Sequence, residues 1–143
     1  MNKLKINRWA AAAFGLLLTG LAQAELAIIA HPDNPEPALT LKQLKRIYLA
    51  KAKTFPQGGA VRYADQREGS PARAEFLSKV LKKREKQLST YWSKMIFTGR
   101  GTPPEVVGGD AEVKQWVIQH PDGLGYIDAR QVDDSIKVLL LVP

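Results

Sequence analysis

Apolar residues along this chain recur with two periods, one typical of strands and one typical of helices. The run 26–30 is entirely apolar, which predicts a buried strand. Three prolines within 31–37 are incompatible with a strand or helix and predict a loop. Thr40 then suits a helix N-cap. A helical spacing follows it and predicts an amphipathic helix that ends near Lys51, with an apolar face formed by Leu41, Leu44, Ile47 and Tyr48.

Weak alternation predicts a second strand over 60–64, and the stretch DQREGSPARAEF at 65–76 comes next. Ser70 suits an N-cap and Pro71 the first position of a helix. An apolar stripe continues that helix through Ala72, Phe76, Leu77, Val80 and Leu81. A basic cluster marks its expected end, with Lys79, Lys82, Lys83, Arg84 and Lys86. The cluster either stabilises the helix dipole as a solvated helix end or forms a docking patch.

The remaining pattern predicts two helices followed by two strands. One helix covers 85–97, with Leu88, Tyr91, Trp92, Met95 and Ile96 expected to face inward. After a Gly/Pro loop at 98–104, Asp110 is expected to cap the other helix. Strands are predicted at 124–128 and 136–142. The order β-α-β-α-α-α-β-β indicates an α/β fold with a mixed central sheet and flanking helices. The simplest place for four aromatic residues is its core: Tyr91, Trp92, Phe97 and Trp116.

Residues 1–24 have the pattern of a secretory signal peptide. Three cations precede a mostly apolar run at 9–21, and Ala22-Gln23-Ala24 resembles a cleavage site. The run is short for a membrane span, although an uncleaved anchor remains an alternative. We therefore expect residues 25–143 to form a single exported, periplasmic domain.

Charge and residue types narrow the possible chemistry. The chain carries 21 Lys and Arg against 14 Asp and Glu, and removal of the signal lowers the net charge from +7 to +4. Such a charge suits anionic small ligands, an anionic membrane surface or acidic partners. No cysteine is present, and both histidines, His31 and His120, precede prolines. No catalytic motif or nucleic-acid-binding module is found, so we expect no enzyme activity, no cofactor, no metal and no nucleic acid.

The loop before Ser70 is the best candidate for a binding site. The first N–H groups of a helix lack intrahelical acceptors, and the helix dipole is positive at this end. Ser70 Oγ, Arg67 and Arg73 are available to an oxyanion there. The alternative is that Ser70 caps the helix with its own side chain while the arginines face water.

Several segments in series resemble the phosphate-binding family of periplasmic solute-binding proteins. LTLKQLKRIYLAKAKTFPQGG at 39–59 is similar to the family's L-T-x-x-Q-L, I-[FY]-L-x-K and W/F-x-x-G-G signals. AVRYADQREGSPARAEF at 60–76 occupies the place of its strand and Ser-Gly-Thr helix start. Tyr91-Trp92, Phe97 with Gly99, Pro104 and PDGLGYID at 121–128 resemble later signals. Together these segments cover 26–142.

The resemblance implies a single three-layer α/β lobe of the type II periplasmic-binding-protein kind. It also implies a non-enzymatic protein that binds phosphate or a related oxyanion and delivers it to a membrane transporter. By correspondence, the ligand-binding residues would be Gln66, Arg67, Glu68, Gly69, Ser70, Ala72 and Arg73.

Two departures favour a second interpretation. Family members have two lobes, whereas this chain corresponds mainly to one. Pro71 and Ala72 replace the family's Gly and Thr, which removes a backbone donor and a hydroxyl. The alternative is a repurposed lobe that acts as a periplasmic protein-interaction or sensory module without a small ligand.

Overall fold

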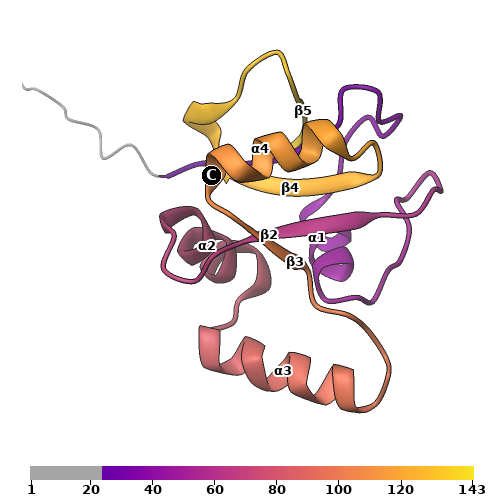
Figure 1. The fold of residues 1–143 in the computed structure, drawn as a ribbon, viewed down its shortest axis with the longest axis vertical. Coiled ribbons are helices and arrows are strands. Elements are labelled where there is room, and N and C mark those ends of the chain that lie inside the picture. Colours follow the sequence, from indigo (N-terminus) through magenta and orange to yellow (C-terminus); the bar gives the residue numbers. More distant parts are fainter. Residues whose placement is uncertain (1–23) are drawn as a thin grey trace, which may run out of the picture.

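The computed structural model describes residues 24–143, which form one five-stranded sheet with helices on both faces (Figure 1). Most of the expected signal peptide, residues 1–23, lies outside this range. Within it, no helix has the length and apolar character needed to span a bilayer. The elements in chain order are β1 (Leu26–Ala30), α1 (Leu41–Tyr48), β2 (Arg62–Gln66), α2 (Pro71–Phe76), the π-helical turn η1 (Leu77–Leu81), α3 (Glu85–Phe97), β3 (Glu105–Gly108), α4 (Asp110–Gln119), β4 (Gly123–Asp128), the 3-10 turn η2 (Ala129–Gln131) and β5 (Lys137–Val142).

The sheet is mixed, with strand order β3-β2-β4-β1-β5. β2 pairs in parallel with both β3 and β4, whereas β1 is antiparallel to both β4 and β5. All five residues of β1 are buried, which matches its uninterrupted apolar sequence. A strand in the middle of a sheet with helices on both faces needs apolar side chains on both sides.

The sheet separates two apolar cores, so the fold has three layers as expected. Alternate residues of β1 point to opposite faces: Ile28 joins the core beneath α1, α2, η1 and α3, and Ile29 joins the core beneath α4. Gly125 on β4 lets α4 approach closely, because a Cβ there would lie 2.5 Å from Val113 Cγ1. The mixed α/β architecture predicted from the sequence is therefore confirmed.

The structure corrects several element predictions. The segment before residue 105 was expected to lead from a loop directly into a helix, but β3 intervenes at the sheet edge. The strand expected at 60–64 is shifted to Arg62–Gln66, and α1 ends at Tyr48 rather than near Lys51. The helix after Ser70 changes to π-helix at Leu77.

Two side chains at the end of α3 were wrongly placed in the core. Ile96 is 58% exposed and Phe97 is 91% exposed. Only Leu88 and Trp92 of this helix are buried. Figure 1 shows the whole of α3 at the lower end of the molecule, away from the strands. Helical spacing identifies one face of a helix, but it does not say how far along the helix a partner covers that face.

Candidate functional site

The candidate site lies where β2 ends and α2 begins. β2 is buried at its last three residues, which places Asp65 and Gln66 inside the protein. A tight turn then leads to Ser70, whose N–H donates to the carbonyl of Arg67 at 3.2 Å. Gly69 has a φ of +89° in this turn, a conformation that glycine adopts at little cost. The exposed loop therefore sits directly above two buried polar side chains.

Ser70 is an N-cap whose hydroxyl group already has both a donor and an acceptor. Its Oγ accepts a hydrogen bond from the N–H of Arg73 at 3.1 Å. The same hydroxyl donates to Oε1 of Gln66 at 2.9 Å, and the residue is 3% exposed. The capping interpretation of Ser70 is thus confirmed. Its hydroxyl hydrogen points into the protein and away from any anion in the loop.

Gln66 fixes the direction of that hydrogen bond. Its Nε2 donates to Oδ1 of Asp110 at 2.7 Å and to the main-chain carbonyl of Tyr126 at 2.9 Å. Because both partners are acceptors, the amide nitrogen must face them and Oε1 must face Ser70. The side chain uses both amide hydrogens and its carbonyl, and Gln66 is only 1% exposed.

Arg73 is the charged centre of the cluster. Its Nε and Nη2 donate to the two carboxylate oxygens of Glu85, at 2.6 and 2.8 Å. Its Nη1 donates to Oδ2 of Asp65 at 2.6 Å and to the carbonyl of Gln66 at 3.2 Å. Hydrogen bonds to Glu85, followed by the charge of Asp65, raise the pKa of Arg73, and the same pairing lowers the pKa of Glu85. The guanidinium group is directed entirely at protein acceptors.

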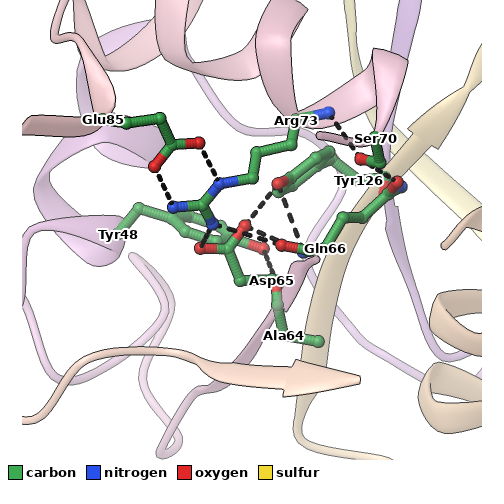
Figure 2. A network of polar contacts seen from close by, with 8 residues as sticks. All are labelled: Tyr48, Ala64, Asp65, Gln66, Ser70, Arg73, Glu85 and Tyr126. Carbon is green, nitrogen blue, oxygen red and sulfur yellow. Dashed lines mark hydrogen bonds and ion pairs between the residues drawn. The ribbon is translucent and has the colours of Figure 1, made fainter. Parts of the chain in front are cut away.

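Tyr126 closes the cluster from β4. Its hydroxyl donates to Oδ1 of Asp65 (Figure 2). Its ring stacks on Phe76 with centroids 4.0 Å apart. Burial, and secondarily the charge of Asp65, raises the pKa of Tyr126. We call the group shown around Arg73 the Arg73 cluster: Asp65, Gln66, Ser70, Arg73, Glu85 and Tyr126.

The residues predicted for the site divide into two groups. Gln66, Ser70 and Arg73 converge in the Arg73 cluster, and Ala72 is buried against the apolar core. The other three are exposed in the loop: Arg67, Glu68 and Gly69. Arg67 lies against Gly109, where an added Cβ would be 2.9 Å from its Nη1.

Sequence reasoning missed Glu85, Asp110 and Tyr126 as members of this region, and it counted Asp65 as the start of the loop but not among the ligand-binding residues. Asp110 was expected to cap α4, but Gly109 holds that position. The Asp110 carboxylate instead accepts from Gln66 and, at 3.3 Å, from the N–H of Asp128. Tyr126 lies within the PDGLGYID segment, so its position carried a signal, but nothing in the local pattern linked it to Asp65.

The local charge is unfavourable for an anion inside the cluster. Two carboxylates, those of Asp65 and Glu85, pair with the single guanidinium of Arg73, and a third, that of Asp110, accepts from Gln66. At the start of α2, Pro71 has no N–H, and the N–H groups of Arg73 and Ala74 donate to Ser70. Of the main-chain N–H groups in this first turn, that of Ala72 remains as a donor for a ligand.

A separate cavity of about 810 Å³ opens beside the loop. Its lining includes Gly69 and Ser70, three consecutive cations, Lys82, Lys83 and Arg84, and two carboxylates, Glu68 and Glu85. We call this space the basic cavity. The tertiary structure thus brings together the two segments that the sequence marked separately, the loop before Ser70 and the basic cluster after it.

The two histidines have structural neighbours in the fold. The Nδ1 of His31 accepts from the N–H of Asp33 at 3.1 Å, and His120 stacks on Trp116 with centroids 4.4 Å apart. Within residues 24–143, no three histidine or acidic side chains gather in a way that could hold a metal ion.

Comparisons with known proteins relate this chain to others through its fold. No family model and no curated protein matches the sequence. A candidate phosphate ABC transporter substrate-binding protein from Clostridium perfringens, solved with bound phosphate, is similar with a TM-score of 0.65 and 24% identity. An ABC-type phosphate transport receptor from Vibrio cholerae is similar with a TM-score of 0.66 and 23% identity. PstS from Borrelia burgdorferi is similar with a TM-score of 0.61 and 15% identity.

The extent of these matches defines what is shared. Each covers 81% of this chain but only 45%, 46% and 47% of the respective neighbours. The chain therefore spans about half the length of the proteins it resembles. It has the fold of one lobe of such binding proteins, as the sequence resemblance predicted.

Proposed function

We propose that this protein is an exported, non-enzymatic docking or sensory module that uses one periplasmic-binding-protein lobe to contact a partner protein and binds no small ligand. One observation carries the proposal: the hydrogen-bond donors that could have held an oxyanion already donate to acceptors within the protein. Ser70 Oγ–H donates to Gln66, and all three nitrogens of the Arg73 guanidinium donate to protein acceptors. The residues that would hold an oxyanion instead hold β2, α2 and α3 together.

The single lobe supports the same proposal. A buried anion loses its hydration and must regain it from many donors that surround it. The similar proteins from Clostridium perfringens and Vibrio cholerae are more than twice as long as the part of them that is matched here. With only one lobe in the described range, a ligand at this loop would be open to water on the other side.

The basic cavity supports a second candidate, weak binding of phosphate or a similar oxyanion. Its lining has three cations against two carboxylates, and Arg67 and the N–H of Ala72 are donors near the same loop. A few hydrogen bonds on an open surface correspond to millimolar affinity, about 4 kcal/mol. In this candidate Lys82 and Arg84, rather than Ser70 and Arg73, supply the main attraction.

Isothermal titration calorimetry with phosphate and sulfate separates the two functions. Absence of saturable heat at millimolar anion, with the fold intact, supports the docking module. Saturable heat that disappears in Lys82→Gln/Arg84→Gln but persists in Ser70→Ala would establish the second candidate. Heat that disappears in Ser70→Ala alone would contradict both, because it would require a free Ser70 hydroxyl.

A further inference from the structure

Charges are unevenly distributed between the two sides of the sheet. Residues 41–100 carry 15 Lys and Arg against four Asp and Glu, whereas residues 101–143 carry three against seven. The first segment contains α1, α2, η1 and α3, which pack on one face, and the second contains α4 on the other face (Figure 1). Two of the cations in 41–100, Arg62 and Arg67, lie toward α4, against Trp116 and Gly109. The others still make the side that carries α1, α2, η1 and α3 strongly basic.

Two adjacent exposed apolar side chains lie on this basic side, at the end of α3. Phe97 is 91% exposed and Ile96 is 58% exposed. Isolated apolar side chains on a surface are common, but a neighbouring pair with an almost fully exposed aromatic ring indicates a contact surface. A turn with φ of +65° at Gly99 ends the helix and leads directly to Arg100.

The ends of α1 and α3 meet at this point. Tyr91 Oη donates to the carbonyl of Leu49 at 2.6 Å, which holds α3 against the end of α1. A depression of about 750 Å³ lies between the two ends, and Lys53, Ile96 and Arg100 are among its lining residues. None of its lining residues is acidic. We call the surface around it the basic tip, formed by Lys51, Lys53, Lys94, Ile96, Phe97 and Arg100, all of them exposed.

We propose that the basic tip binds the surface of an anionic lipid bilayer, with Phe97 and Ile96 inserted at the boundary between headgroups and acyl chains. Aromatic and aliphatic side chains flanked by Lys and Arg are the composition that binds such an interface. Long cationic side chains can keep their charge at the lipid phosphates while their stems cover apolar surface. Anionic lipids attract each cation near the surface, so the basic side also orients the molecule.

The shape of the tip favours a bilayer over a protein partner. Phe97 protrudes from the helix end and does not line the depression beside it. A fluid bilayer closes around a protruding ring without needing a matching pocket. This inference goes beyond the proposed function and does not depend on it, because membrane contact is compatible with a docking module and with weak anion binding.

Sedimentation with lipid vesicles tests the proposal. The processed protein, purified from the periplasm of an expression host, is mixed with vesicles of phosphatidylglycerol and phosphatidylcholine in equal parts, or of phosphatidylcholine alone. We expect binding to the mixed vesicles that weakens as salt is raised, and much weaker binding to phosphatidylcholine. Equal binding to both vesicles, or binding to neither at low salt, would overturn the proposal.

Matched variants locate the contact. Phe97→Ser should weaken binding roughly tenfold or more, the effect of burying one aromatic side chain. Leu141→Ser removes an apolar side chain that is 50% exposed on the edge strand β5, and binding should stay within about twofold. All variants share one N-terminus, so any contribution of that end cancels. Equal losses in Phe97→Ser and Leu141→Ser would contradict insertion of the tip.

A second pair of variants tests the charges. Lys94→Gln/Arg100→Gln should weaken binding about tenfold or more, at roughly fivefold for each cation near an anionic surface. Arg62→Gln/Arg130→Gln changes the net charge equally and should have a much smaller effect. Equal effects would show attraction by net charge alone and overturn the proposal. If the protein ignores vesicles but binds soluble poly-glutamate through Phe97, the partner is an acidic protein and the bilayer proposal is wrong.

Discussion

Arg73 holds Glu85 through two parallel hydrogen bonds, 2.6 and 2.8 Å long, that join the first turn of α2 to the first turn of α3. The third guanidinium nitrogen reaches Asp65 on β2. One side chain therefore ties a strand to two helices. This arrangement gives Arg73 a structural role, whereas the ligand-binding role suggested by its type and position stays a prediction.

Replacement of Glu85 tests that structural role. Glu85→Gln keeps the shape of the side chain but removes a charged pair, and because Glu85 is 38% exposed we expect a loss of only about 1–2 kcal/mol. Glu75→Gln is the matched control, since Glu75 pairs with Lys79 on the helix surface and such pairs contribute roughly 0.3–0.5 kcal/mol. Urea unfolding measures both. Equal losses would mean that the Arg73 cluster stabilises no more than a surface pair.

Replacement of the Gln66 amide nitrogen by an oxygen, as in Gln66→Glu, should destabilise the protein. In Gln66→Glu, a buried carboxylate would face the Asp110 carboxylate and the Tyr126 carbonyl, which both need a donor. We expect a loss of about 3–5 kcal/mol in the free energy of unfolding, typical of an uncompensated buried charge. The same change at exposed Gln115 should stay within about 0.5 kcal/mol. A Gln66→Glu protein as stable as wild type would mean that the assigned amide orientation is wrong.

Alkaline pH should destabilise the protein through its tyrosines. Burial raises the pKa of Tyr48, Tyr63, Tyr91 and Tyr126 above the usual 10.0. A group with a raised folded-state pKa contributes stability that is present below its unfolded pKa and is lost as pH rises through the folded pKa. Stability should thus fall above about pH 10.

Ultraviolet titration of tyrosinate absorbance checks this expectation. In the folded protein the four midpoints should lie above 10, and in concentrated urea they should return to about 10. A folded protein in which most tyrosines ionise near pH 10 would contradict the burial of these hydroxyl groups.

Gly125 should be needed for the packing of α4 on β4. In Gly125→Ala the new Cβ would lie 2.5 Å from Val113 Cγ1 and 3.3 Å from Val117 Cγ2. Such overpacking costs about 1–3 kcal/mol. Val113→Ala in the same chain removes the closest atom, so a double-mutant cycle should show favourable coupling. If the stability losses of Gly125→Ala and Val113→Ala simply add in the double variant, the overpacking does not arise from contact between these two residues.

The strongest sequence predictions concerned residues whose partners are near in the chain. The capping roles of Thr40 and Ser70 are both confirmed, because each cap accepts from a main-chain N–H three residues later. The buried strand β1 is confirmed because its continuous apolar run requires cover on both faces. In contrast, β3 has only four residues and becomes a strand through its pairing with β2, which no local pattern reveals.

The sequence by itself determined the caps, the apolar faces and the mixed α/β class, because these follow from local geometry and the period of apolar residues. Only the tertiary structure decided which partners the polar groups around the Ser70 loop have. The donors of Ser70 and Arg73 are taken by Gln66, Asp65 and Glu85. Tyr126, which lies 61 residues after Asp65 in the chain, completes the cluster by donating a hydrogen bond to Asp65. A hydrogen bond needs its partner in place, and strand pairing, not sequence distance, brings these partners together.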